Sequence, residues 1–391
     1  MEAPAPSLLE LARVYLWISL MGFGGPSAHL ALMLDEVVER RGWLTRERFL
    51  ELMAVTNLLP GPNSSEVAIH VGYAMRGWRG AMVTGLSFLL PTFFMVTGFS
   101  VLYFRWGTLP QVEALFWGVQ PVIVAIVVSA GVKIGRAGVK TRTQAVLAAA
   151  GAAVSLFSGI AIVPAMLLGG AVTAWRRRPA LVVALLPSGS LLSPEGLPTR
   201  GLLASAAAAT AAGAAATGTL ATVFLLHLGI GSVLFGGGYV LVALLEPYAV
   251  GRFAWLTAGQ FLDGVALTQA VPGPISTLSA FVGYAAAGVP GAILGTAGIY
   301  LPAFAAVLLT APQLERVRDL PSVRRALDGV VAVAAGAVLG VGVDLAVAAI
   351  GDVVTLLLAA VALVAATWKK VPALWLVAFG LAAGGLRALL F

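Results

Sequence analysis

The chain has 391 residues but no cysteine and only three histidines. The absence of cysteine excludes disulfides, thiol catalysis, cysteine-ligated zinc and iron–sulfur clusters. The histidines, His29, His70 and His227, are scattered and lack the spacing of a metal site. The nucleotide-binding pattern GxxxxGK[ST] is also missing. We therefore expect no metal and no cofactor.

Charged residues are scarce, at 10% of the chain against about 25% in soluble domains. Hydrophobic residues make up 60%, and the mean hydropathy is +0.97. Apolar runs at 80–104, 119–132 and 289–311 approach or exceed the ~20 residues that span a bilayer. The composition predicts a multi-pass, all-α membrane protein in contact with lipid.

The net charge of +7 does not indicate a nucleic-acid partner. The arginines lie in short loops between apolar spans, where positive charge marks the cytoplasmic face. No basic helix interleaved with exposed aromatics is present. The N-terminus also lacks the basic region and the small-residue cleavage site of a signal peptide, so we expect the first apolar segment to be retained.

Two glycine- and proline-rich motifs occur twice, 212 residues apart. The FGGP motif at 23–26 returns as FGGG at 235–238, and the LPGP motif at 59–62 returns as VPGP at 271–274. A Trp-Leu-Thr sequence lies at the same place between the motifs of each pair. The chain is therefore a fused duplication.

The correspondence continues at an offset of 211, and it sets the expected domains. We expect a first transmembrane repeat at 1–186, a linker at 187–220 and a second repeat at 221–391. Two Trp-basic-Pro motifs, beginning at Trp175 and Trp368, are only 193 residues apart. This shorter offset predicts that the second copy has lost about one helix.

Loop charges indicate how the copies are oriented. Loop 35–48 has four arginines, whereas its counterpart 247–260 has only Arg252. Loop 133–142 has four basic residues, and its counterpart 344–352 has none. The positive-inside rule then places equivalent loops on opposite membrane faces. We expect two inverted-topology repeats.

The four motifs are expected to break helices inside the membrane. Proline removes a backbone donor, and a broken helix is tolerated in a bilayer only inside protein or beside a polar cavity. Segment 49–75 is short, has a break near its middle and has arginine in both flanking loops. This pattern favours a re-entrant hairpin over a single crossing, and 261–287 repeats it.

Each break exposes a helix N-terminus with unpaired N–H groups and about half a positive charge. Four such ends near the midplane would offer roughly two positive charges, which suits a small tetrahedral dianion. Kinks that ease helix packing are the alternative. The candidate substrate-binding residues, on these ends or just ahead of them, are Gly24, Gly25, Ser27, His29, Asn57, Gly61, Asn63, Ser64, Gly236, Gly237, Gly238, Gln269, Gly273, Ser276 and Thr277.

Four titratable residues are candidates for proton coupling or gating, because intramembrane acids are costly and usually functional. Glu51 and Asp263 occupy equivalent positions, although each could instead complement the dipole of a capped helix, as at the capping-box sequence that begins at Thr257. Glu66 and His70 share a helix face. They form either a proton relay or a structural hydrogen bond. His29 similarly either touches the anion or bonds a neighbouring carbonyl.

The order of FGGP, a following His29, Trp-Leu-Thr, LPGP, Gly-Tyr and the FLLP sequence at 88–91 resembles the chromate ion transporter (CHR) family. The resemblance covers both halves of the chain. It implies export of chromate across the cytoplasmic (inner) membrane and chromate resistance, with sulfate as a structural relative. The second copy departs from the first, because Gly238 replaces Pro26 and Leu241 stands where His29 would align.

We therefore expect a secondary active transporter that exports chromate by alternating access, driven by the proton gradient or the membrane potential, and not an enzyme. An uptake carrier or channel for sulfate or another oxyanion is the alternative within this class. A membrane-embedded enzyme or lipid-handling scaffold would need a buried nucleophile with a base, or clustered metal ligands, and neither is visible. A homodimer is compatible with this architecture.

Overall fold

The computed structural model describes residues 6–23, 25–56, 58–107, 109–175, 220–313 and 321–390. Every regular element in these ranges is helical, which confirms the all-α prediction. The first copy contains α1 (Leu8–Met21), α2 (Pro26–Leu34), η1 (Asp35–Arg40), α3 (Arg46–Thr56), α4 (Asn63–Trp106), α5 (Pro110–Gly138), α6 (Arg142–Ser158), η2 (Gly159–Ala161) and α7 (Ile162–Trp175). The expected linker at 187–220 lies outside the described residues, apart from Leu220.

The second copy repeats the α-helices in order and, within the described residues, differs only in its short 3-10 helices. It contains α10 (Leu220–Gly231), α11 (Gly238–Glu246), η3 (Pro247–Arg252), α12 (Ala258–Ala270), η4 (Ile275–Thr277), α13 (Leu278–Thr310), η5 (Ala311–Gln313), α15 (Pro321–Ala349), α16 (Val353–Thr367) and α17 (Ala373–Leu390). Even the short π-helices η1 and η3 correspond. The duplication therefore extends to individual helices.

The expected loss of one helix from the second copy is wrong. Helices α5, α6 and α7 have counterparts α15, α16 and α17, and each counterpart begins 211 residues later. The two tryptophan motifs misled because they are not equivalent. Trp175 is the last residue of α7, whereas Trp368 follows α16.

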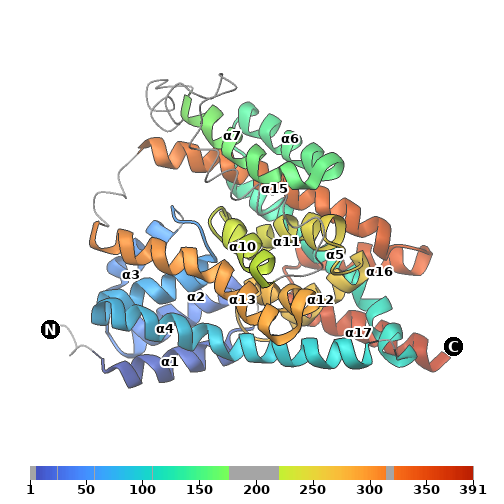
Figure 1. Cartoon of the computed structure of the whole chain (residues 1–391), viewed down its shortest axis with the longest axis horizontal. Coiled ribbons are helices and arrows are strands. Elements are labelled where there is room, and N and C mark those ends of the chain that lie inside the picture. Colours follow the sequence, from blue (N-terminus) through green and yellow to red (C-terminus); the bar gives the residue numbers. More distant parts are fainter. Residues whose placement is uncertain are drawn as a thin grey trace.

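The two copies interlock through their last three helices. Helices α6 and α7 of the first copy pack on α15 of the second, as Figure 1 shows at the top of the view. Reciprocally, α16 and α17 pack on α5. Glycines let the backbones approach, because a Cβ on Gly118 would clash with the backbone of Gly380 and one on Gly151 with that of Val333. Each copy therefore completes the fold of the other.

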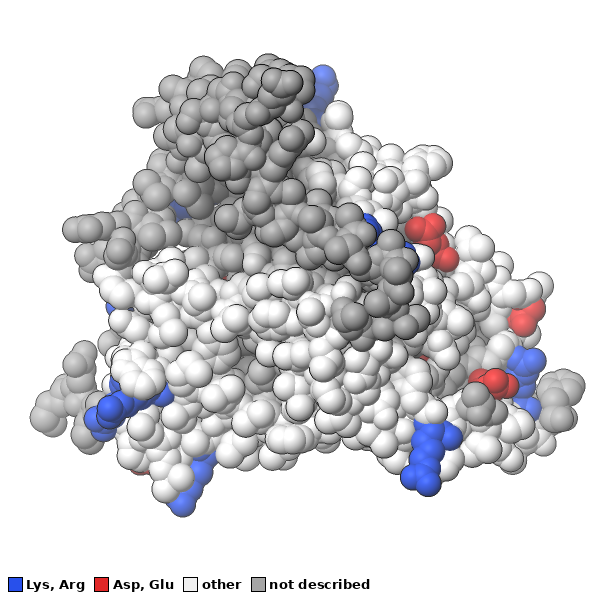
Figure 2. Space-filling view, in the orientation of Figure 1, with Lys and Arg blue, Asp and Glu red and all other residues white. Residues whose placement is uncertain are grey.

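Five helical stretches in the described part of the chain are long and apolar enough to cross a membrane: Asn63–Trp106, Pro110–Gly138, Arg142–Ala174, Ile275–Thr310 and Arg324–Ala349. Large apolar side chains are exposed on the outside of the bundle, including Phe94, Phe157 and Val347. Figure 2 shows a broad uncharged area in the lower part of the view, with most of the visible Lys and Arg residues near the edges of the molecule. Such a surface belongs in lipid, so the chain is a multi-pass membrane protein.

Helices α4 and α13 each contain a sharp reversal. The backbone leaves helical geometry at Arg76 and Gly77 in α4 and at Ala287 and Gly288 in α13. The chain then folds back on itself, since the Thr84 hydroxyl donates to the carbonyl of Ala68 at 2.7 Å. The part of α4 before the reversal therefore forms a short helix between the LPGP break and a tight turn.

Candidate functional site

All four motifs interrupt helices, as the sequence predicted. The breaks lie between consecutive helices of each copy, namely α1 and α2, α3 and α4, α10 and α11, and α12 and η4. Backbone φ is positive at Gly25, Gly61, Gly236, Gly237 and Gly273, the positions on which the breaks turn. Residues with a Cβ rarely adopt these conformations, which explains why glycine stands there.

The breaks meet in reciprocal pairs across the two copies. The amide of Gly61 donates to the carbonyl of Leu234 at 2.8 Å, and the amide of Gly273 donates to the carbonyl of Gly22 at 3.2 Å. Gly273 lies 212 residues after Gly61, as Leu234 does after Gly22. The PGP glycine of each copy therefore donates to the residue just before the FGG motif of the other copy. Such reciprocal contacts are the signature of a two-fold relation.

Further contacts join these pairs into one cluster. The His29 ring bonds Ser64, which connects the two breaks of the first copy. A Cβ on Gly238 would lie 3.8 Å from the amide nitrogen of Ser276, which brings the breaks of the second copy together. All four helix starts therefore lie in one region of the protein.

The helix starts at the breaks differ from four other helix starts in how they are capped. Capping boxes close the N-termini of α1, α6, α12 and α16, including the predicted Thr257–Gln260 box of α12. No side-chain cap is present at the starts of α2, α4, α11 or η4. The N-cap residues of these helices, Gly25, Pro62, Gly237 and Pro274, contribute no side-chain hydrogen bond to the first turn.

The two kinds of break also differ in the space around them. A Cβ on Gly25 or Gly237 would meet no atom within 4 Å, so the starts of α2 and α11 open onto free space. A Cβ on Gly61 would lie 2.8 Å from that of Ala303, and one on Gly273 would clash with Thr92. The FGG breaks are therefore open, whereas the PGP breaks are packed.

His29 is fully buried and uses both ring nitrogens. Its Nε2 lies 2.9 Å from the carbonyl of Gly22, and its Nδ1 lies 3.3 Å from the hydroxyl of Ser64. A carbonyl can only accept, so in the neutral ring Nε2 carries the hydrogen and Nδ1 accepts from Ser64. Of the two roles open to His29 from sequence, the structure contains the bond to a neighbouring carbonyl.

The second copy has its own polar contacts at the equivalent helix starts. The Ser276 and Tyr300 hydroxyls lie 2.6 Å apart, and the Thr277 hydroxyl donates to the carbonyl of Pro274 at 2.8 Å. The Gln269 amide donates to the Tyr239 hydroxyl at 2.6 Å, which joins α12 to the start of α11. These candidates therefore lie in the cluster.

The structure gives less detail for the remaining candidates. Ser27 is exposed in the first turn of α2, and Asn63 is the first residue of α4. Gly24 and Asn57 lie outside the described residues.

The Glu66 side chain is fully buried beside the LPGP break, and a Cβ on Gly61 would lie 2.8 Å from its Oε1. Neither carboxylate oxygen has a hydrogen-bond partner among the described residues. His70 bonds the backbone carbonyl of Glu66 through Nδ1, at 3.2 Å, rather than its carboxylate. The predicted shared helix face is present, but no direct Glu–His side-chain hydrogen bond is formed.

The equivalent acids Glu51 and Asp263 have different surroundings. Glu51 is partly exposed and pairs with Arg48 at 3.0 Å. Asp263 is buried and accepts hydrogen bonds from the Tyr103 hydroxyl at 2.6 Å and the Gln120 amide at 2.9 Å. Asp263 therefore ties α12 of the second copy to α4 and α5 of the first.

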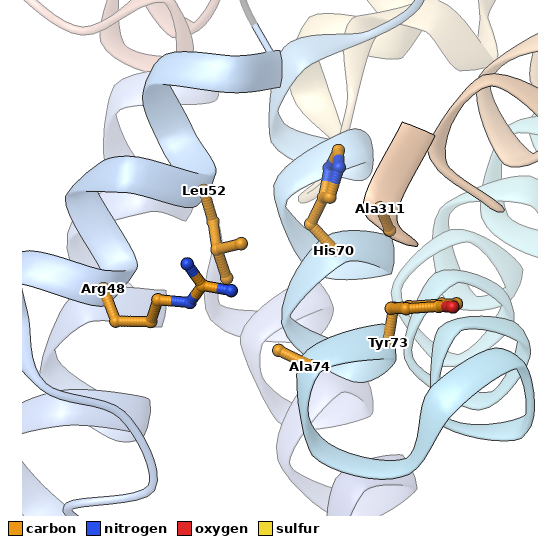
Figure 3. A pocket seen from close by; sticks show the side chains of 6 residues that line it. All are labelled: Arg48, Leu52, His70, Tyr73, Ala74 and Ala311. Carbon is orange, nitrogen blue, oxygen red and sulfur yellow. The ribbon is translucent and has the colours of Figure 1, made fainter. Parts of the chain in front are cut away.

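A cavity of about 170 Å³ lies between α3, α4 and η5. Figure 3 shows its lining residues, which are Arg48, Leu52, His70, Tyr73, Ala74 and Ala311. His70 lines this cavity, and its buried Nε2 has no hydrogen-bond partner in the described part of the chain.

Sequence reasoning missed several residues of the cluster. The Thr92 hydroxyl donates to the carbonyl of Pro272 at 2.9 Å and lies 3.4 Å from the hydroxyl of Ser19. Tyr300, Tyr103 and Gln120 were also missed. Thr92 follows the matched Leu-Pro pair, where the second copy has Ala303. That difference was visible in the sequence, but nothing there placed Thr92 against the opposite PGP break.

The model of one protein family matches both halves of the chain. The family is described as chromate transporter, and the match covers residues 9–175 and 221–385. These two segments coincide with the repeats and leave out the region between them.

Two curated relatives that match most of the chain are named chromate transport proteins. The chromate transport protein of Pseudomonas aeruginosa is 34% identical over 88% of this chain and 82% of its own length. That of Cupriavidus metallidurans is 30% identical over 92% of this chain and 88% of its own. The uncharacterised transporter YwrA of Bacillus subtilis is 29% identical over 48% of this chain but 97% of its own length, so it has the length of one repeat.

No solved structure matches the chain. The family match nevertheless covers most of the sequence and both copies of the break motifs, and it is a family of transporters rather than enzymes. This protein is a member of the chromate transporter family.

Proposed function

We propose that the protein exports chromate across the cytoplasmic membrane by alternating access and accepts sulfate as an analogue. Its full-length relatives in Pseudomonas and Cupriavidus are named chromate transport proteins. The observation that supports a transport site most is the reciprocal pairing of Gly61 with Leu234 and Gly273 with Gly22. It gathers four helix breaks where one small ligand would meet both copies.

In this proposal the oxyanion binds at the starts of α2 and α11. These N-termini carry no side-chain cap and open onto free space, unlike the packed PGP breaks. Their N–H groups and partial positive charges suit a tetrahedral dianion. Ser27 in the first turn of α2 and the Tyr239–Gln269 pair at α11 are placed to add hydrogen bonds.

The PGP breaks would support this site rather than bind the anion directly. Gly61 and Gly273 hold the carbonyls just ahead of the FGG breaks. Ser64 positions His29, whose ring bonds the same Gly22 carbonyl. The proposal therefore narrows the sequence-derived set, with Asn63, Ser64, Ser276 and Thr277 in the supporting layer.

We further propose that the repeats are inverted and that segments 49–75 and 261–287 are re-entrant. The reciprocal hydrogen bonds support a two-fold relation between the copies. The unequal basic loops, 35–48 against 247–260 and 133–142 against 344–352, favour an axis in the membrane plane. Rocking of one copy against the other around a central site would then give alternating access.

Flux measurements in proteoliposomes test this function. The purified protein should show saturable chromate flux that excess sulfate inhibits, measured with and without a pH gradient or a potassium-diffusion potential. A Gly237→Leu variant, which should block the start of α11, serves as the inactive control. An absence of saturable oxyanion flux under every condition contradicts the proposal. Net inward movement under a physiological potential would replace export with uptake.

A further inference from the structure

We propose that Glu66 binds a proton that travels in the same direction as the oxyanion, so that proton and dianion occupy the protein together. This inference rests on the proposed oxyanion transport and specifies its coupling. The observation behind it is a fully buried carboxyl group beside the LPGP break that has no hydrogen-bond partner among the described residues.

An ionised Glu66 is incompatible with the structure as it stands. Removing a carboxylate from water costs several kcal/mol unless a cation or hydrogen bonds compensate it. Neither of its oxygens has a hydrogen bond in the described structure. The neutral, protonated acid is therefore the form that this conformation accepts.

Among the described residues, no cation bonds the Glu66 carboxyl group. The titratable or charged groups on α4 and on the helices that pack against it are Glu10, Arg13 and Tyr15 of α1, His29 of α2, Arg46, Glu47, Arg48 and Glu51 of α3, His70, Tyr73, Arg76, Arg79, Tyr103 and Arg105 of α4, Asp263 of α12, and Tyr284 and Tyr300 of α13. Arg48 pairs with Glu51, His29 bonds Gly22 and Ser64, and Asp263 accepts from Tyr103 and Gln120. A proton is thus the simplest way to neutralise Glu66.

The position of Glu66 couples its proton to the anion. Its carboxyl group lies against Gly61, whose amide holds the carbonyl of Leu234 immediately ahead of the open FGG break. A dianion bound at that break would repel an ionised Glu66, because like charges in a buried site disfavour each other's charged form. Protonation of Glu66 should therefore favour anion binding, and by linkage anion binding should favour protonation.

A route for the proton is also present. His70 bonds the backbone carbonyl of Glu66 with Nδ1 and also lines the cavity beside Arg48 (Figure 3), and its buried Nε2 has no partner in the described structure. A histidine ring can take up a proton at one nitrogen and release one from the other. His70 would therefore relay protons between the cavity and the carboxyl group one helical turn away.

The difference between the two copies sets the number of protons carried with each anion. Leu278 and Val282 occupy the positions equivalent to Glu66 and His70, so each chain has one such carboxyl group. One proton carried with one dianion leaves a net charge of −1 on the transported pair. An inside-negative potential then favours export, whereas an acidic exterior opposes it.

The test is equilibrium binding of radiolabelled sulfate to the purified full chain across mildly acidic to mildly alkaline pH. Sulfate remains a dianion throughout, so any pH dependence belongs to the protein. In the wild type we expect affinity to fall by up to about tenfold per pH unit as Glu66 loses its proton. Glu66→Gln, which mimics the protonated acid, should bind sulfate at every pH as tightly as the wild type does at acidic pH.

The matched control is Glu113→Gln, which replaces an exposed acid in the first turn of α5 and should keep the wild-type pH dependence. A Glu66→Gln variant that follows the wild-type pH profile, or that loses sulfate binding while remaining folded by thermal denaturation, overturns the inference. Failure of the wild type to bind sulfate at any pH would instead overturn the proposed oxyanion site, so the two failures are distinguishable.

Discussion

The amide of Gly61 donates a hydrogen bond to the carbonyl of Leu234, at 2.8 Å, and thereby joins the LPGP break of one copy to the FGG break of the other. The equivalent bond from Gly273 to Gly22 completes the pair. Neither copy can build this centre alone, because each supplies the donor for one bond and the acceptor for the other.

The interlocking predicts a specific cross-link in a chain that naturally lacks cysteine. A Cβ on Gly138 of α5 would lie 3.8 Å from that of Val331 on α15, close to the mean Cβ separation of about 3.8 Å in disulfides. The double variant Gly138→Cys, Val331→Cys should form a disulfide on mild oxidation. After cleavage at a protease site inserted in the linker, the two halves should remain joined on a gel.

The control for this cross-link replaces Val331→Cys with Val343→Cys. Val343 is exposed and lies about 18 Å along α15 from Val331, beyond disulfide reach. Equal cross-linking of both pairs would show that the halves do not hold the packing described.

Thr92 should be important for the stability of the PGP break in the second copy. Thr92→Val keeps the volume but leaves the Pro272 carbonyl without its donor, which costs about 1–3 kcal/mol for a buried group. Thr92→Ser keeps the hydroxyl and should stay close to the wild type. Thermal denaturation in detergent measures the difference, and equal melting temperatures for the two variants would dismiss the hydrogen bond as a source of stability.

His29 should act through its two hydrogen bonds rather than through charge. His29→Leu introduces the residue found at the equivalent position of the second copy, Leu241, and removes the donor to Gly22 and the acceptor for Ser64. We expect a loss of about 1–3 kcal/mol in stability and weaker sulfate binding. His29→Gln, which supplies an amide donor, should recover part of both. A Gln variant no better than Leu in either measurement would point to a role that only imidazole can fill.

Asp263 and Glu51 are equivalent in sequence but should respond differently to replacement. Asp263→Ala leaves the partly buried Tyr103 and Gln120 donors unpaired and should destabilise the protein by about 1–3 kcal/mol in total. Glu51→Ala removes a partly exposed ion pair with Arg48, worth about 0–1 kcal/mol. Chemical denaturation of both variants measures their free energies of unfolding. A larger loss of stability for Glu51→Ala than for Asp263→Ala would contradict the view that Asp263 is the acid that holds the structure together.

Sequence reasoning predicted the duplication and the breaks because both depend on local features. Glycine and proline at a repeated spacing leave few backbone conformations, and the positive φ angles at Gly61 and Gly273 confirm the consequence. The predicted loss of one helix from the second copy was wrong because it depended on two short motifs that are not equivalent. Trp175 and Trp368 share neighbours in sequence but lie at the ends of non-equivalent helices.

The sequence predicted the backbone breaks of the site but not the side-chain contacts around them. The sequence contains both Thr92 and the VPGP motif, but they are about 180 residues apart, and only the packed fold brings the hydroxyl to Pro272. Likewise, the division between open FGG breaks and packed PGP breaks depends on neighbours such as Ala303, which no local pattern specifies. Long-range packing therefore decided which of four similar motifs face free space.

The most direct test of the central claim is sulfate binding to a variant with a negative charge at the start of α2. Ser27→Asp places a carboxylate in the first turn of the open helix, where it would occupy the partial positive charge that the account gives to the oxyanion. Ser7→Asp is the control, since Ser7 already caps α1 and aspartate caps equally well. We expect Ser27→Asp to abolish saturable sulfate binding at an unchanged or raised melting temperature, while Ser7→Asp binds as the wild type does. Wild-type sulfate affinity in Ser27→Asp would contradict it.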